Sequence, residues 1–201
     1  VEYSEKYSKE LLTLYMLSAF PIGNDGDYDR RDAILNFNAK MANNFGNLVN
    51  RVVVLTMKLW LENGLSWNID SEIWENINKY QDIYSELMNN YDLKESLDTT
   101  FFFLDKLNKF ADTKAPWQTI KDDDKTETIE TLYTLAEWVR QVGLNLYAFF
   151  PEKMLELFTK LGLESYSERL ENGELEILRK ETPVFKITEK GSPLFARFEV
   201  E

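Results

Sequence analysis

The sequence predicts an all-α protein folded as a helical bundle, and three observations support this prediction. Apolar residues recur at steps of three and four over most of the chain, which is the spacing of one helix face. Only 8 Gly and 5 Pro interrupt the 201 residues, which favours long helices over many short strands and turns. Hydrophobic residues make up 44% of the chain, enough for a packed core although 29% of the residues are charged. We expect a single domain over residues 1–201.

The first two predicted helices lie on either side of a turn. Residues 3–20 carry apolar side chains at helical spacing and stop at residues 21–26, where Pro, Gly and Asn occur together. Asp29 is the expected cap of an unusually long second helix, which we expect to reach about Leu61. One apolar stripe runs along it, formed by Ile34, Phe37, Met41, Phe45, Leu48, Val52, Leu55 and Leu59. Such a stripe predicts a helix that faces the core along its whole length.

Two further helices are predicted over residues 70–90 and 92–112, with Asp92 as the cap of the second. Their pattern stops at Pro116, which is followed directly by Trp117. A proline lacks the backbone N–H that a helix interior needs, so it interrupts the preceding helix. We therefore expect a break in the chain at this point, with Trp117 beside it.

The last part of the chain is predicted to hold one long and one short helix before a tail. Asp124 and Glu127 have the spacing of a capping box, and apolar residues continue at helical spacing beyond them. Pro151 suits the first turn of a short helix that ends near Gly162. Residues 174–201 read as irregular and are expected to form an extended C-terminal tail.

The chain has no Cys and no His, and this excludes several kinds of chemistry. Disulfides, zinc sites built on thiolate or imidazole, and catalysis through a histidine base all need those side chains. Alternating aspartates within residues 25–29 imitate the start of a calcium loop, but Arg30 and Asn36 stand where that loop needs Gly and Glu. The three aspartates at 122–124 suit a solvated run before a helix N-terminus. We expect no metal site and no catalytic residue in this chain.

The formal net charge is −12, from 35 acidic and 23 basic residues. Such a balance argues against nucleic-acid binding, because contact with phosphates is electrostatic. A local basic or aromatic patch can still bind RNA on an acidic body. The sequence has no apolar run long enough for a membrane span and no basic-then-apolar leader, and nothing in it requires an oxidising compartment. We expect a soluble, cytoplasmic protein.

Two segments carry candidate binding residues. In the middle of the predicted long helix, a Gly and two Asn interrupt good helix formers, and Asn47, Arg51, Val54 and Lys58 share one flank beside the apolar stripe. The second segment places Trp117 at the predicted break, between two lysines. A tryptophan usually packs in a core, but an exposed one at a helix junction can stack on a nucleic-acid base.

These segments resemble the anticodon-binding domain of the methionyl-tRNA synthetases. Further stretches resemble the same family in the same order, so that the resemblance covers essentially the whole chain. It implies that residues 1–29 form a linker helix and turn toward a catalytic domain. The matching stretches are Tyr7 to Phe20, Gly23 to Tyr28, Gly46-Asn47-Leu48-Val49-Asn50-Arg51, Ala115-Pro116-Trp117, Phe149-Phe150-Pro151 and Pro193-Leu194-Phe195-Ala196-Arg197.

The resemblance implies a stacking role for Trp117 in the Pro116-Trp117 motif. If Trp117 is a stacking platform, we expect it to project from the break, with a largely exposed indole in the free domain. In the alternative interpretation, Trp117 is a buried core residue.

The resemblance also implies that an Asn and a basic residue four apart on the long helix hydrogen-bond to base edges. The basic residue falls at Lys58, which keeps the positive charge of the commoner Arg but lacks the planar fork of hydrogen-bond donors of a guanidinium. The Asn falls at Val54, which cannot hydrogen-bond. Either a neighbour such as Asn50 or Arg51 reads that base, or the register is displaced.

The implied function is recognition of the CAU anticodon of the initiator and elongator methionine tRNAs. The family attaches methionine to tRNA with ATP, but its HIGH-type and KMSKS-type catalytic stretches are absent from this sequence. We therefore expect ATP and methionine to bind a catalytic domain that precedes Val1, and this chain alone to be non-catalytic. That domain and tRNA are the expected partners, with neither DNA nor a membrane among them. The alternatives are a helical scaffold that binds a protein partner and the equivalent domain of a leucine, valine, isoleucine or cysteine synthetase.

Overall fold

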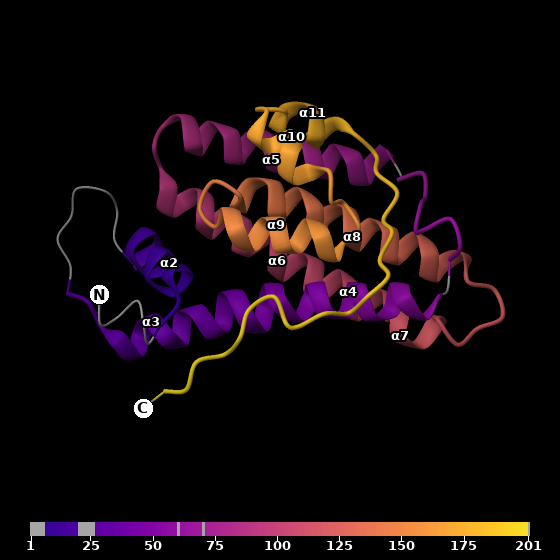
Figure 1. Ribbon diagram of the computed structural model, residues 1–201, viewed down its shortest axis with the longest axis horizontal. Coiled ribbons are helices and arrows are strands. Elements are labelled where there is room, and N and C mark those ends of the chain that lie inside the picture. The colour runs from indigo at the N-terminus through magenta and orange to yellow at the C-terminus, as the bar shows by residue number, and fades with distance from the viewer. Residues whose placement is uncertain (1–6, 20–26, 60, 70, 201) are drawn as a thin grey trace.

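The computed structural model describes residues 7–19, 27–59, 61–69 and 71–200, and they fold as a helical bundle (Figure 1). Within these ranges the only β-type pairing is an isolated bridge between Leu65 and Phe185. The predicted all-α class is therefore confirmed. The elements are α2 (Lys9–Ala19), α3 (Arg30–Phe37), η1 (Asn38–Gly46), α4 (Asn47–Lys58), α5 (Ser71–Asn89), α6 (Leu93–Lys114), α7 (Pro116–Thr119), α8 (Thr126–Leu146), α9 (Pro151–Lys160), α10 (Tyr166–Glu171) and α11 (Leu175–Lys180).

The predicted long helix exists as three consecutive pieces, α3, η1 and α4. Asp29 caps it as predicted, because its side chain accepts a hydrogen bond of 3.0 Å from the backbone N–H of Asp32. The helix ends at Lys58, three residues before the predicted Leu61. Its apolar stripe is buried throughout, apart from the half-buried Leu59. The middle piece η1 is a π-helix, a form that is rare and often found near functional sites.

Helix α8 lies at the centre of the bundle. It packs against α4, α5, α6, α7, α9 and α11, and every residue from Thr131 to Leu146 is buried. Gly143 makes one of these contacts possible, because a Cβ at that position would lie 2.7 Å from the Leu157 side chain of α9. A helix that is buried on nearly every side needs neighbours all around it, and the bundle provides them.

Two of the predicted helix caps are not formed as the sequence predicts. Asp92 precedes α6, but its side chain makes no capping hydrogen bond. Asp124 does accept hydrogen bonds from the backbone and hydroxyl of Thr126, at 2.9 and 2.6 Å. Glu127 pairs with Lys114 instead of completing the predicted box. Pro151 begins α9 as predicted.

The predicted tail at 174–201 is wrong at its start. Residues 175–180 form the short helix α11, and the extended path begins only after it. From there the tail crosses the end of the bundle and runs back along α4, η1 and α3 (Figure 1). Near its end, Phe198 and the side chain of Asn38 exchange two hydrogen bonds of 2.8 and 3.0 Å. The turn predicted at 21–26 and the first residues of the linker at 1–6 lie outside the described residues.

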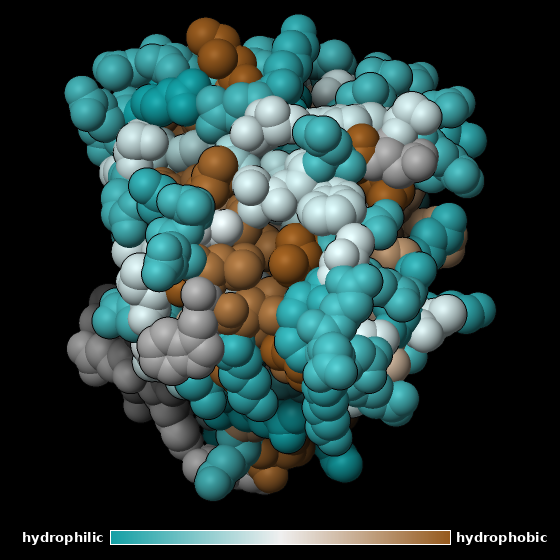
Figure 2. All heavy atoms as spheres, turned by 90° about the vertical axis from the view of Figure 1, so that its right-hand side faces the viewer, coloured by the Kyte–Doolittle hydropathy of each residue, from teal (hydrophilic) through white to brown (hydrophobic). Residues whose placement is uncertain are grey.

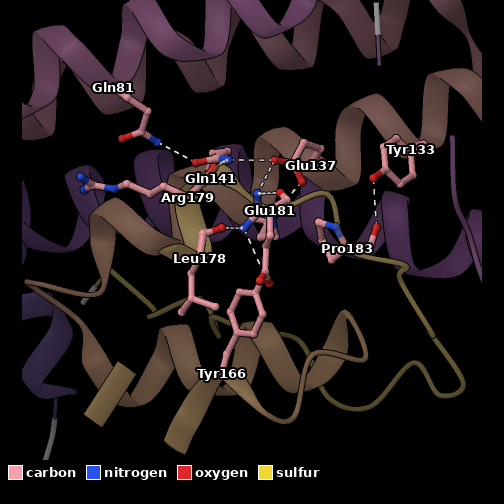
Figure 3. Close-up of polar contacts among 10 residues, drawn as sticks. Gln81, Tyr133, Glu137, Gln141, Tyr166, Leu178, Arg179, Glu181 and Pro183 are labelled. Atoms are coloured by element: carbon pink, nitrogen blue, oxygen red, sulfur yellow. Dashed lines mark hydrogen bonds and ion pairs between the residues drawn. The ribbon is translucent and has the colours of Figure 1, made fainter. Parts of the chain in front are cut away.

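A buried polar network ties the start of the tail to α8 (Figure 3). Glu137 and Arg140 form an ion pair with fully buried side chains, and the Arg140 Nε donates to Glu137 at 2.7 Å. Arg140 also donates to the backbone carbonyls of Leu178 and Glu181 and to the hydroxyl of Tyr166. Burial opposes the charge of Arg140, but the Glu137 carboxylate outweighs it and raises the pKa of Arg140. The tail therefore leaves α11 in a fixed direction.

Candidate nucleic-acid interface

Trp117 sits where the backbone reverses after α6. Ala115 adopts the left-handed conformation with φ 44°, and Pro116 starts the four-residue helix α7. Pro116 is buried and Trp117 is half-buried against the core. The expected largely exposed indole is therefore wrong. The buried proline and the left-handed turn hold the ring against its neighbours, so Trp117 presents only part of its surface to solvent.

Arg51 covers the Trp117 ring from α4. Its guanidinium carbon lies 5.8 Å from the ring centroid, within the range of a cation–π contact. Two residues of α6 orient that guanidinium: Asp112 accepts a hydrogen bond of 2.9 Å from Nη1, and the Asn108 side chain accepts one from Nη2. These two bonds use only some of the five N–H donors of the guanidinium, and the other N–H groups remain for a ligand.

Polar side chains between the long helix and α6 fix Asn108 in turn. Its amide group donates to the Oδ1 of Asn44 and, at 3.1 Å, to the carbonyl of Leu104. The Asn44 amide donates to Asp105 at 2.7 Å. The chain of contacts runs from Asp105 through Asn44 and Asn108 to Arg51. Because Asn44, Asn108 and Arg51 are each held by at least two partners, the guanidinium of Arg51 is oriented over Trp117 in the free protein.

The other predicted site residues lie along the same helix at different distances from Trp117. Asn50 is exposed, Val54 is half-buried and Lys58 is exposed. Lys58 lies seven residues beyond Arg51, which is about 10 Å along a helix axis. Of the predicted residues, the structure thus brings Arg51, Pro116 and Trp117 together, whereas Val54 and Lys58 belong to a neighbouring feature.

Asn47 shares the predicted flank, although no base-reading role is predicted for it from the sequence. It is exposed and lies four residues before Arg51, one turn back along α4. Asn47 and Arg51 are thus also an Asn and a basic residue four apart, and of the two it is Arg51 that lies over Trp117. The sequence shows this spacing for both pairs, and only the contacts of the Arg51 side chain with α6 and with Trp117 distinguish Asn47 and Arg51 from Val54 and Lys58.

Val54 and Lys58 line a pocket of about 710 Å³ at the end of α4. The opposite wall comes from the C-terminal tail, whose path no local sequence pattern predicts. The lining residues are Val54, Thr56, Met57, Lys58, Leu61, Glu62, Gly64, Leu65, Phe185, Lys186, Ile187, Thr188 and Lys190. Figure 2 looks at this end of the molecule, where apolar side chains gather in a hollow with hydrophilic residues around it.

The described part of the chain contains neither a metal-binding cluster nor a membrane-spanning helix. It holds no group of three or more acidic, His or Cys side chains placed to bind a metal ion, and the aspartates at 122–124 form none. Within the same residues, no helix combines the length and the apolar character that crossing a membrane requires.

Comparison with known proteins identifies the relatives of this fold. A family model described as tRNA synthetases class I (M) matches residues 1–53. Methionine–tRNA ligases are 29% identical in Enterococcus faecalis and 30% identical in Bacillus subtilis, in each case over 98% of this chain. The chain spans about 30% of the length of these relatives.

The solved structures agree with the sequence relatives. The apo methionyl-tRNA synthetase of Mycobacterium tuberculosis matches 98% of this chain with a TM-score of 0.84 and 19% identity, over 40% of its own length. The methionyl-adenylate complex of the same enzyme matches with a TM-score of 0.82. At such low identity these matches concern the fold alone. Over nearly all of its length, the chain is thus similar in sequence to part of the methionine–tRNA ligases and similar in fold to part of a methionyl-tRNA synthetase.

Proposed function

We propose that this chain binds the anticodon loop of methionine tRNA and reads its CAU triplet. The observation that carries the proposal is the orientation of Arg51 over Trp117, with the exposed Asn47 one helical turn away. A base can stack on the free part of the Trp117 ring, since stacking tolerates any base with a π-face. Asn47 and the unused donors of Arg51 then face the edge of that base or of its neighbour.

Arginine suits this task better than lysine, because its planar fork can make two parallel hydrogen bonds to one base. Asp112 and Asn108 hold the fork before RNA arrives, so little side-chain freedom is lost on binding. The relatives named above are methionine–tRNA ligases, which supports tRNA as the partner. We propose the ATP-dependent attachment of methionine for the longer, cytoplasmic protein, and anticodon binding for this part of it.

The test is a titration of the chain with a labelled anticodon stem-loop that carries CAU. Trp117→Ala should weaken binding about ten- to a hundred-fold, because stacking one base is worth about 1–3 kcal/mol. The matched control is Trp74→Ala, since Trp74 is also half-buried but lies on α5, away from Arg51. Arg51→Lys should also weaken binding while it keeps the charge.

Two results would contradict the proposal. In the first, Trp117→Ala melts earlier but binds RNA as tightly per folded molecule as the unchanged chain, which would make Trp117 a packing residue. In the second, the chain binds a stem-loop with a scrambled triplet as tightly as the CAU loop. That result would favour a helical domain that contacts RNA without reading it, or one that serves a protein partner.

A further inference from the structure

A polar seam joins α5, α8 and α11 inside the bundle (Figure 3). Gln81 of α5 donates to the Oε1 of Gln141 on α8 at 2.9 Å, and Gln141 donates to the backbone carbonyl of Arg179 on α11 at 2.8 Å. One turn further along α8, the Oδ1 of Asn145 accepts a hydrogen bond of 2.8 Å from the Nη2 of Arg179. Because α5 and α11 both pack on α8, these side chains meet in one region of the interior.

Three side-chain atoms of this seam are buried without a hydrogen-bond partner among the described residues. They are the Oε1 of Gln81, the Nδ2 of Asn145 and the Nε of Arg179. In Figure 3 the side chains of Gln81 and Arg179 both lie on the same side of Gln141, which contacts both residues. The large majority of buried polar atoms in folded proteins bond to protein or to ordered water, because an unpaired one costs free energy.

Exchanging the oxygen and the nitrogen of an amide group does not supply the missing bonds. Gln141 has to direct its nitrogen at the Glu137 carboxylate and the Arg179 carbonyl, since both accept hydrogen bonds. Its oxygen therefore faces Gln81, which has to present its own nitrogen there and turn its Oε1 away. Asn145 presents its oxygen to a guanidinium N–H for the same reason, which turns its Nδ2 away. Fixed partners thus determine which amide atoms stay unpaired.

The unpaired atoms need a partner that both donates and accepts. The Nδ2 of Asn145 and the Nε of Arg179 are donors, whereas the Oε1 of Gln81 is an acceptor. The Tyr80 hydroxyl faces the same place: burial raises the pKa of Tyr80 to about 12, and the Asn145 amide opposes this rise. Tyr80 donates to Thr100 at 3.0 Å, so the hydroxyl oxygen can accept one more hydrogen bond.

Only a small neutral molecule suits this set of atoms. An anion would be repelled by the carbonyl oxygen of Gln81, and a cation would be repelled by the guanidinium of Arg179. Water accepts two hydrogen bonds and donates two, and an internal water in a protein makes about three on average. The two donors and two acceptors described above therefore match one water molecule.

We propose that this cluster binds one internal water molecule, which accepts from Arg179 and Asn145 and donates to Gln81. The proposal is independent of RNA binding at Trp117. The water adds a link between α5 and α11 beside the one that runs through Gln141. Since α11 leads directly into the C-terminal tail, this link helps to fix the point from which the tail starts.

The first test detects the water in the unchanged chain by nuclear magnetic resonance. Nuclear Overhauser cross-peaks from the water signal should reach the Nε–H of Arg179 and the Nδ2–H groups of Asn145, because a bound water stays close to both. Absence of cross-peaks to both groups would overturn the proposal. Magnetic relaxation dispersion of the solvent then counts the long-lived internal waters of each variant.

The second test removes the acceptor. Gln81→Met keeps the length of the side chain, and Gln118→Met is the control, since Gln118 is exposed on α7 and lies outside the seam. Gln81→Met should hold one long-lived water fewer than the unchanged chain. The backbone amides of Ile177 and Leu178, which bond to Glu174 in the unchanged chain, should exchange with solvent about five- to ten-fold faster, the effect of about one lost hydrogen bond. The control should change neither quantity.

Circular dichroism shows whether each variant is folded, so that a lost water is not confused with a lost fold. A folded Gln81→Met with as many long-lived waters as the unchanged chain would overturn the water site. A lost water with unchanged exchange at Ile177 and Leu178 would overturn its role as a link to α11.

Discussion

Replacement of Glu137 by Leu should destabilise the chain strongly, because it leaves the charge of Arg140 buried without its partner. The side chains of both residues are fully buried. Loss of one partner of a buried ion pair costs about 3–5 kcal/mol. For a chain of this size, 1 kcal/mol corresponds to about 2–4 °C in the melting temperature, so the midpoint should fall by roughly 6–20 °C. Circular dichroism during heating or urea titration measures this loss.

The double variant Glu137→Leu with Arg140→Met tests the reason for the loss. It removes the buried charge, but it also removes the donors to the carbonyls of Leu178 and Glu181. Each of these carbonyls, if it is left without a hydrogen bond, lowers the free energy of unfolding by about 1–3 kcal/mol. These effects offset one another, so the double variant should be about as stable as Glu137→Leu alone. A double variant whose loss equals the sum of the two single losses would refute the coupling between the residues.

Two further predictions concern the pocket and the cap of α8. Gly162→Ala should lower the free energy of unfolding by about 1–3 kcal/mol in a urea titration. The left-handed backbone of Gly162 is unfavourable for alanine, and the added Cβ would lie 2.3 Å from the carbonyl oxygen of Lys186, so the tail must move away. A variant as stable as the wild type would show that the tail can shift at no cost in stability. The hydrogen bond from the Thr126 side chain lowers the pKa of Asp124 below its ordinary value of 3.8. The stabilisation is thus present above about pH 4 and is lost as the pH falls through the lowered pKa, so the melting difference between wild type and Asp124→Ala should shrink in acid. A difference that is constant from pH 7 to pH 2 would contradict this reason.

The helices could be predicted because their signals are local. The apolar stripe from Ile34 to Leu55 and the cap at Asp29 depend on residues within one helix, and both are confirmed. Helix α11 was missed because its six residues are too few for a periodic pattern to stand out. The course of the tail could not be predicted, since the bridge of Leu65 with Phe185 joins residues 120 positions apart and no local pattern encodes such a pairing. The extent of the single domain stays a prediction.

The position of the candidate site on the long helix could not be predicted from local spacing either. The flank repeats at steps of four, three and four, so a motif spaced by four fits the pair Asn47 and Arg51 and also the pair Val54 and Lys58. Spacing alone cannot choose between two pairs on one flank. The choice needs the third member, Trp117, which reaches α4 only through the packing of α6 and α7. Since Arg51 is the residue that lies over Trp117, the proposed function assigns the base to the pair Asn47 and Arg51, whereas Lys58 lines the pocket together with the tail.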